Sequence, residues 1–247
     1  MKLKIIGSSS KGNSYILETP TGSLILDCGV RFREIQKALG FNLSDVYGCL
    51  VTHEHGDHAK AVKDVLKAAI NVYASMPTLK ALGITERHLA VSIKSNQQFT
   101  MGDFIVLPFP TEHDAADPLG FLIQYKPTGE KLLFATDTFF IRHRFNGLNY
   151  IVIECNYCRE VLEENVKEGH VSEGLKSRII ESHFSLENVK GFLKANDLSQ
   201  VKKIVLIHLS DGNSNATRMV SEIKELTKKD TVIAEPGKVI ELVMCPF

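Results

Sequence analysis

A short polar stretch, VTHEHGDH at residues 51–58, constrains the fold of this chain more than any other feature. Four potential metal ligands, His53, His55, Asp57 and His58, fall within six positions, although the whole chain of 247 residues has only nine histidines. The apolar run 48–52 before them is typical of a buried strand, and the amphipathic segment 59–70 after them is typical of a helix. The ligands are therefore expected on the loop between the two, where functional sites are common.

The spacing within this loop predicts two metal positions. In extended backbone, residues two apart face the same side with their Cα atoms about 7 Å apart, so His53 and His55 can bind one ion. Gly56 then allows a sharp turn, which lets Asp57 and His58 face a second ion. A helical His-Glu-x-x-His site would need a histidine where Asp57 stands and a helix through Gly56. A merely solvated loop is disfavoured by the apolar segments on both sides.

The pattern His-x-His-x-Asp-His resembles the signature of the metallo-β-lactamase superfamily. The resemblance implies one domain over residues 1–247 with an α/β fold, a four-layer αβ/βα sandwich of two mixed β-sheets flanked by helices. The order of the expected elements agrees, because two runs of strands, each followed by helices, favour two mixed sheets covered by helices on the outside.

The resemblance also implies a set of metal ligands in motifs spread along the chain. In that set His53, His55 and His113 bind one ion, Asp57, His58 and His208 bind the other, and Asp137 bridges the two. Asp27, at the end of the apolar run 24–26, orients the histidine loop without binding metal. Imidazole and carboxylate ligands suit zinc, with manganese or iron as alternatives. The expected cofactor is therefore a pair of divalent ions.

Two of these positions have simpler interpretations when taken alone. His113 could be an ordinary surface histidine, and Asp137 could cap a helix over residues 138–145. Neither interpretation explains why both residues follow apolar strands in the order that the superfamily requires.

A further histidine, His183, lies just before an amphipathic segment at 186–195, for which Ser185 is a suitable N-cap. Backbone donors and the dipole at such a helix start favour an anion such as phosphate. His183 belongs to the run Ser182–Ser185 and lies 25 positions before His208. This run is similar to a motif of the nucleic-acid-processing branch of the superfamily. That branch includes tRNA 3′-end endonucleases and bacterial WalJ/YycJ-type exonucleases. The similarity implies that His183 approaches the scissile phosphate and protonates or stabilises the leaving group, and that Asp57 belongs to phosphodiester chemistry.

Three weaker stretches, at residues 8–14, 154–157 and 175–178, are also similar to the WalJ/YycJ type. They suggest substrate contacts from Ser10, Asn13, Lys176 and Arg178, together with His183 and Ser185. The loop expected at 7–13 is either an anion-binding nest of backbone N–H groups or a plain mobile connection. Lys176 and Arg178 contact backbone phosphate or belong to an ordinary solvated face.

Composition and charge set wider limits. With 29 residues of each sign the formal net charge is zero, so no global basic field indicates nucleic acid, which counts weakly against a nuclease. No stretch is apolar enough to span a membrane, and the start Met1–Lys4 lacks the features of a signal peptide, so a cytoplasmic protein is expected. The five scattered cysteines fit reduced thiols, and the single pair Cys155 and Cys158 lacks the partner pair of a structural zinc site.

Two ions would lower the pKa of a bridging water toward neutrality, which predicts hydrolysis of a carbonyl or phosphoryl centre by a metal-bridging hydroxide. The first hypothesis is a DNA exonuclease that digests 5′ to 3′ from duplex ends. Only 24 positions separate His113 from Asp137 and 71 separate Asp137 from His208, which leaves no room for a tRNA-gripping arm or an inserted domain. The alternatives are an RNA-processing nuclease and a small-molecule hydrolase for lactones, thioesters or cyclic nucleotides. A non-enzymatic metal-dependent binding module is disfavoured by the complete ligand set, and the oligomeric state is left open.

Overall fold

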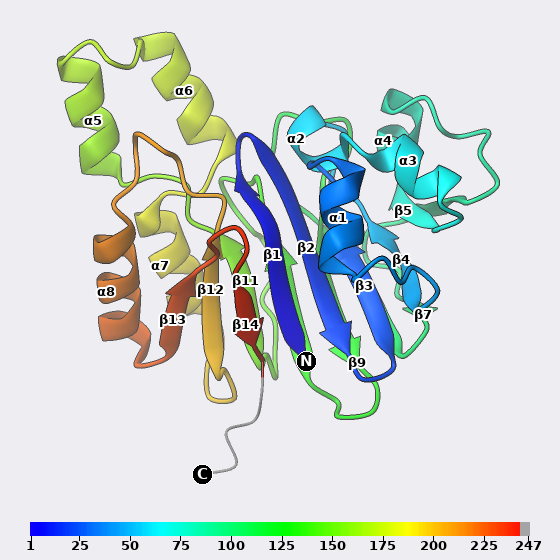
Figure 1. The fold of residues 1–247 in the computed structure, drawn as a ribbon. Helices are drawn as coiled ribbons and strands as arrows, with labels where there is room; N and C mark the ends of the chain where they lie inside the picture. Colours follow the sequence, from blue (N-terminus) through cyan, green and yellow to red (C-terminus); the bar gives the residue numbers. More distant parts are fainter. Residues whose placement is uncertain (243–247) are drawn as a thin grey trace. The chain divides into compact units, whose positions relative to one another are not determined.

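The computed structural model describes residues 1–242. The chain divides into two compact units: unit 1 comprises residues 1–110, 115–129 and the chain from Glu235 onward, and unit 2 comprises residues 111–114 and 130–234. The strands described form two sheets of seven, in the orders β14-β1-β2-β3-β4-β5-β6 and β13-β12-β11-β10-β9-β8-β7 (Figure 1). The prediction of a single domain over residues 1–247 stays a prediction.

The first sheet lies wholly in unit 1. Its strands are β1 (Lys2–Ser9), β2 (Gly12–Thr19), β3 (Gly22–Leu26), β4 (Val46–Leu50), β5 (Val72–Ser75), β6 (Ala90–Ile93) and β14 (Val239–Glu241). Strands β14, β1, β2 and β3 pair antiparallel, whereas β3, β4, β5 and β6 pair parallel. Parallel neighbours need crossover connections, which here contain helices, so the polar loops after β3 and β4 are brought to the same edge of the sheet.

The crossover helices of unit 1 are short. They are α1 (Phe32–Ala38), α2 (Gly56–Ala59), α3 (Val62–Lys67) and α4 (Met76–Ala81). Buried side chains from these helices and from the sheet, among them Ile25, Ile35, Cys49 and Val65, form one hydrophobic cluster. The same unit holds β7 (Phe99–Met101), β8 (Phe104–Pro110) and β9 (Leu119–Tyr125), which pair antiparallel in chain order.

Unit 2 is built on four parallel strands. These are β10 (Lys131–Ala135), β11 (Tyr150–Glu154), β12 (Lys203–Ile207) and β13 (Asp230–Ile233). Each is a nearly continuous apolar run, as expected for parallel strands that are buried on both faces. The helices of the unit are α5 (Arg159–Lys167), α6 (Glu173–Ser182), α7 (Leu186–Ala195) and α8 (Ala216–Thr227).

Three local expectations are corrected by the structure. Residues 7–13 are not a long loop, because β1 and β2 form a tight hairpin that leaves only Ser10 and Lys11 in the turn, so the strand ladder uses the amides that a nest would need. Gly56 does not make a sharp turn but begins helix α2, where the amides of His58 and Ala59 both donate to the carbonyl oxygen of His55. The stretch between the expected helix 159–167 and His183, whose polar composition predicts a loop around His170, instead contains helix α6, Glu173–Ser182.

The cysteines in the described part of the chain, Cys28, Cys49, Cys155 and Cys158, are buried free thiols, and Cys245 lies outside the described residues. The sequence also predicts a last strand over residues 239–244: it is present as β14 over Val239–Glu241, and its predicted end at Met244 lies outside the described residues. Within residues 1–242 no helix has the length and apolar character needed to cross a membrane.

Candidate metal centre

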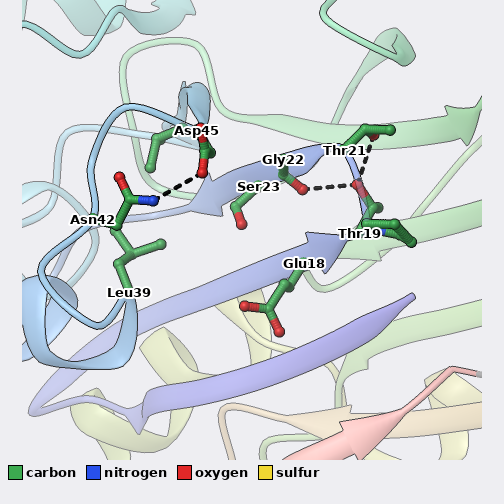
Figure 2. Close-up of a pocket in the computed structure, with 10 residues that line it drawn as sticks. Glu18, Thr19, Thr21, Gly22, Ser23, Leu39, Asn42 and Asp45 are labelled. Atoms are coloured by element: carbon green, nitrogen blue, oxygen red, sulfur yellow. Dashed lines mark hydrogen bonds between the residues drawn. The ribbon is translucent and has the colours of Figure 1, made fainter.

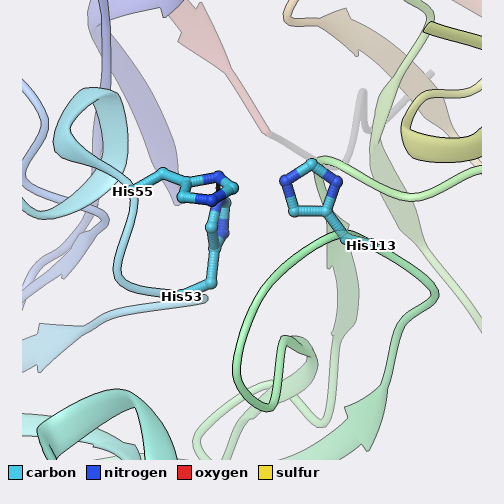
Figure 3. A group of neighbouring side chains, drawn as sticks. All are labelled: His53, His55 and His113. Carbon is cyan, nitrogen blue, oxygen red and sulfur yellow. Dashed lines mark hydrogen bonds between the residues drawn. The ribbon is translucent and has the colours of Figure 1, made fainter. Parts of the chain in front are cut away.

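The loop after β4 carries two histidines whose ring nitrogens converge. His53 Nε2 lies 3.1 Å from His55 Nδ1, and the two ring centroids are 4.7 Å apart (Figure 3). The other nitrogen of His53, Nδ1, lies 3.0 Å from the hydroxyl of Thr52. The two rings therefore present one nitrogen each to the same point, as the alternation of side chains in extended backbone predicts.

Asp27 holds His58, the last histidine of the loop in unit 1. Its carboxylate accepts hydrogen bonds from the amide (2.8 Å) and hydroxyl (3.1 Å) of Thr52, and from Nδ1 of His58 at 2.8 Å. Burial raises the pKa of the Asp27 carboxyl, although His58 and the donors of Thr52 oppose this shift. Since a carboxylate only accepts, His58 must donate from Nδ1, which makes Nε2 the nitrogen that can bind a metal. Asp57 Oδ2 lies 3.5 Å from that Nε2.

A glycine that follows Asp27 makes this approach possible. A side chain at Gly29 would place its Cβ 1.7 Å from the carbonyl oxygen of Asp57. The Cys28 amide donates to the His58 carbonyl oxygen at 2.7 Å. The Asp27 strand end and helix α2 are thus in direct backbone contact.

Unit 2 gathers three predicted ligands from three different strand ends. His113 follows β8, Asp137 follows β10 after one residue, and His208 comes directly after β12. Asp137 Oδ2 lies 3.8 Å from His113 Nε2, and Asp137 Oδ1 lies 3.4 Å from His208 Nδ1. The side chains of all three are almost fully buried, so the interpretation of His113 as an ordinary surface residue is wrong. Residues 138–145 form no helix, which removes the interpretation of Asp137 as a helix cap.

Three of the predicted residues adopt left-handed backbone conformations although none is glycine. The φ angles of Asp27, Asp137 and His208 are 56°, 45° and 54°. Such conformations are uncommon for residues with a side chain and cluster at functional sites, because the surrounding structure must offset their strain. All three lie directly after or close to a strand end, where the strain turns the side chain away from the strand direction.

Glu154, the last residue of β11, is the residue that sequence reasoning missed. Its Oε1 accepts from Nδ1 of His183 at 2.7 Å and from Nδ1 of His208 at 2.8 Å, and its Oε2 accepts from the backbone amides of Thr138 and Phe184. Burial alone would raise the pKa of Glu154, but the charge and hydrogen bond of His183 and the hydrogen bond of His208 outweigh it and lower the pKa. Its position at the end of an apolar strand, like that of Asp27, was the available signal.

His183 lies beside this buried carboxylate but keeps contact with solvent. Its side chain is 21% exposed, and Nδ1 lies 3.9 Å from Asp137 Oδ2. Burial alone would lower the pKa of His183. The charge and hydrogen bond of Glu154 and the charge of Asp137 outweigh burial and raise the pKa above the ordinary value. An imidazole with a raised pKa that remains accessible can hold a proton and donate it to a substrate.

The donor set in both units fits divalent metal ions. In His58 and His208, Nδ1 donates to a carboxylate, and in His113 it donates to the carbonyl oxygen of Ser182 at 3.0 Å. This is the usual outer arrangement of metal-binding histidines, which leaves Nε2 for the ion. In unit 2, ligand atoms of Asp137, Glu154, His183 and His208 all lie within 4.8 Å of one another, close enough to hold an ion. Burial lowers the pKa of His113, which favours the neutral form that ligation requires.

Two of the expected substrate contacts have protein partners in the structure. Ser185 is buried, and its hydroxyl accepts from the amide of Asn188 at 3.1 Å, so it caps α7 as predicted, while its contact with substrate stays a prediction. Asn13 is also buried, with its amide nitrogen 3.0 Å from His58 Nε2, so it supports the histidine loop. Ser10 lies exposed in the β1–β2 turn.

The remaining expected contacts lie on α6. Lys176 pairs with Glu173 at 3.7 Å, and Arg178 is exposed. Helix α6 ends at Ser182, directly before His183, and the contact of both residues with substrate stays a prediction.

Comparison with known proteins places the chain in a family. Residues 23–209 match the model of the beta-lactamase superfamily domain. The chain is 30% identical to exodeoxyribonuclease YycJ of Bacillus anthracis, over 95% of this chain and 92% of that protein. It is 27% identical to exodeoxyribonuclease WalJ of Streptococcus pneumoniae serotype 2, over 97% and 93% of the two chains.

Among solved structures, the metallo-beta-lactamase fold protein YhfI from Bacillus subtilis is similar, with a TM-score of 0.71 and 16% identity over 97% of this chain and 99% of that one. The metallo-β-lactamase fold expected from the sequence is thereby confirmed. With its clustered histidines and aspartates, the chain is a metal-dependent hydrolase. It belongs to the beta-lactamase superfamily.

Proposed function

We propose that this chain is a dinuclear metal-dependent phosphodiesterase, and specifically a DNA exonuclease that digests 5′ to 3′. The observation that carries the proposal is His183, a partly exposed histidine bound to buried Glu154 and close to Asp137. It lies outside the seven expected metal ligands and is suited to act on a leaving group. The names of the two relatives described above, both exodeoxyribonucleases and both similar over nearly their whole length, support DNA as the substrate.

In this proposal the chain is a single domain over residues 1–247, and the seven expected residues are the metal ligands. His53, His55, Asp57 and His58 come from unit 1, and His113, Asp137 and His208 come from unit 2. Zinc is the first choice for both ions, with manganese or iron as alternatives. When bound, such a pair polarises a phosphoryl oxygen and supplies a water of lowered pKa.

The protein groups then position the reaction and move its proton. Asp27 and Thr52 fix the ring of His58, and Glu154 fixes the rings of His183 and His208. With Nδ1 bound to Glu154, Nε2 of His183 donates a proton to the oxygen that leaves the phosphorus; Glu154 raises the pKa of the ring, which favours the protonated form, and the exposed part of the ring can meet the substrate. The free cysteine thiols are in keeping with a cytoplasmic enzyme.

A panel of substrates tests the proposal. Metal-loaded protein is incubated with end-labelled DNA, end-labelled RNA, bis-p-nitrophenyl phosphate and a chromogenic lactone, each with and without EDTA. We expect metal-dependent release of nucleotides from the 5′ end of DNA, with slower action on RNA. Hydrolysis of the lactone alone would reject the phosphodiesterase, and faster digestion of RNA would favour an RNA-processing nuclease.

Glu154 gives a more specific prediction. In the wild-type protein one carboxylate oxygen of Glu154 accepts from His183 and His208, and the other accepts from the backbone amides of Thr138 and Phe184. Glu154→Gln replaces one of these oxygens by an NH2 group, so one of the two pairs of donors would face another donor. We expect turnover of bis-p-nitrophenyl phosphate to fall by about ten- to a hundredfold, the usual effect of losing an outer partner of a metal-site histidine. Glu163→Gln, an exposed glutamate on α5, is the matched control. Equal turnover in both variants would show that Glu154 serves the fold alone.

A further inference from the structure

The segment that follows Asp137 combines aromatic and basic residues without forming a helix or strand. It reads FFIRHRF over residues 139–145 and runs along helix α7. Between the segment and the helix lies a cavity of about 280 Å³. Its wall includes Phe140, Arg142, Arg144, Phe184, Asn188 and Phe192. All of these residues belong to unit 2.

Another cavity, in unit 1, has a different chemistry. It has a volume of about 350 Å³ and is lined by Glu18, Asp45 and several threonine and backbone groups (Figure 2). It lies where β3 begins, whereas the histidine loop follows the far end of the parallel strand β4. Carboxylates in its wall would repel a phosphate, so this cavity does not suit a nucleic acid.

The unit 2 cavity suits a nucleotide in both charge and shape. Phe140 is 52% exposed, although it is a large aromatic side chain. Arg144 is exposed and pairs with no carboxylate within residues 1–242, and Arg142 is mostly exposed although it pairs with Glu112 at 2.6 Å. Exposed aromatic rings beside arginines are the elements with which proteins bind single-stranded nucleic acid.

The arrangement of these groups sets the orientation of the nucleotide. Glu187 also lines the cavity, and its carboxylate disfavours a phosphate inside. An uncharged base can enter between the phenylalanines, with its phosphate outside near the two arginines. The volume of about 280 Å³ is close to the lower end of the range of about 300–1,000 Å³ that is common for small-molecule sites, which suits a single base.

The cavity is also tied closely to the reacting groups. Phe140 follows Asp137 by three positions, a span of at most about 10 Å. The hydroxyl of Thr138 donates to the Phe140 carbonyl oxygen at 2.8 Å and accepts from the Glu112 amide at 2.9 Å. Asn188 of α7 donates to the Phe139 carbonyl oxygen at 3.0 Å. A base in the cavity therefore belongs to a nucleotide close to the phosphate that is cut.

We propose that this cavity binds one unstacked base next to the scissile phosphate, so that the enzyme acts on a single-stranded or frayed end. The inference rests on the proposed function and specifies its substrate. A base that lies in the cavity between phenylalanine side chains has left the base stack, and so it is no longer paired with the partner strand. A blunt duplex must therefore open before it can be cut, whereas a strand with an unpaired end is bound directly.

Binding is tested first in EDTA, where no cleavage occurs. The probe is a single-stranded oligonucleotide with 2-aminopurine near its 5′ end, whose fluorescence reports stacking. We expect Phe140→Ala to weaken binding by roughly five- to a hundredfold, the effect of losing one base–aromatic stack. Phe41→Ala, which removes an aromatic ring that is 63% exposed in unit 1, is the matched control. Arg144→Gln should reduce the slope of log K against log salt by about 0.7, the loss of one phosphate contact on a single strand.

Cleavage by metal-loaded protein separates this inference from the proposed function. Phe140→Ala should raise KM for single-stranded DNA and leave kcat for the same substrate nearly unchanged, because the stacked base contributes to binding and not to the chemical step. For wild-type protein, KM should rise by a similar factor when the base beside the cut site is removed from the oligonucleotide to leave an abasic residue. If wild-type protein cuts DNA but tolerates the abasic residue fully, or if Phe140→Ala binds as well as Phe41→Ala, the cavity holds no base. If wild-type protein cuts neither DNA nor bis-p-nitrophenyl phosphate, the phosphodiesterase itself is rejected.

Discussion

Replacement of His183 by alanine is expected to lower turnover of DNA by roughly two to four decades while both metal ions stay bound. The reason is geometric: His183 is held by Glu154 at 2.7 Å and remains partly exposed, whereas the expected ligands of unit 2 are almost fully buried. Loss of the ring removes the proton donor for the leaving oxygen but no expected ligand. Single-turnover kinetics and the metal content of the same sample measure the two effects separately.

His170→Ala is the control for this variant, since His170 is an exposed histidine in the same unit. His183, Asp137, Glu154 and His208 are close enough to share one ion, so His183 could instead be a ligand. In that case the alanine variant would lose metal together with activity. Unchanged turnover with full metal content would remove His183 from the mechanism.

Replacement of Asp137 by alanine is expected to act through the metals. This carboxylate lies between His113 and His208, at 3.8 and 3.4 Å from their ring nitrogens, and is the expected bridge between the two ions. Removal of an outer partner of a metal ligand already weakens binding by about ten- to a hundredfold, so loss of the bridge should weaken it by more than about a hundredfold. The ion bound by Asp57, His58 and His208 should be affected most. Metal titration of the purified variant, followed by calorimetry, measures this loss.

Asp137→Asn keeps the shape of the side chain and one accepting oxygen for the Thr136 hydroxyl, which donates to Asp137 at 2.6 Å. If the alanine variant loses metal only because the strand end is disturbed, the asparagine variant should bind both ions normally. Asp64→Ala, at an exposed position on α3, controls for the loss of a carboxylate elsewhere. Full metal occupancy in Asp137→Ala would contradict the bridging role.

The parts of the site that could be predicted from the sequence are those that depend only on the spacing of neighbouring residues. His53 and His55 converge because alternate residues of an extended segment face one side, and this needs no knowledge of the fold. Asp27 and Asp137 could be found because each ends an apolar strand, and the ends of neighbouring parallel strands meet at one edge of a sheet. The resemblance to the superfamily came from the histidine loop, and the superfamily's motif order then implied the roles of Asp27 and Asp137.

The parts that could not be predicted depend on contacts between distant positions. Glu154 binds His183 and His208, which lie 29 and 54 positions further along the chain, and no local pattern contains this relation. Helix α6 was missed because most of its residues are polar: its large apolar side chains are Leu175, Ile179 and Ile180, so its apolar face is narrow. The role of Gly56 was misjudged because the His55 carbonyl oxygen accepts from two amides and starts a helix where a turn was expected.

The proposed chemistry requires seven side chains of this chain to hold a pair of divalent ions together. Mass spectrometry measures the metal content of protein that has been loaded with zinc and then desalted. We expect two ions per chain in the wild-type protein and the loss of at least one in Asp137→Ala. A wild-type chain that retains fewer than one ion after loading would contradict it.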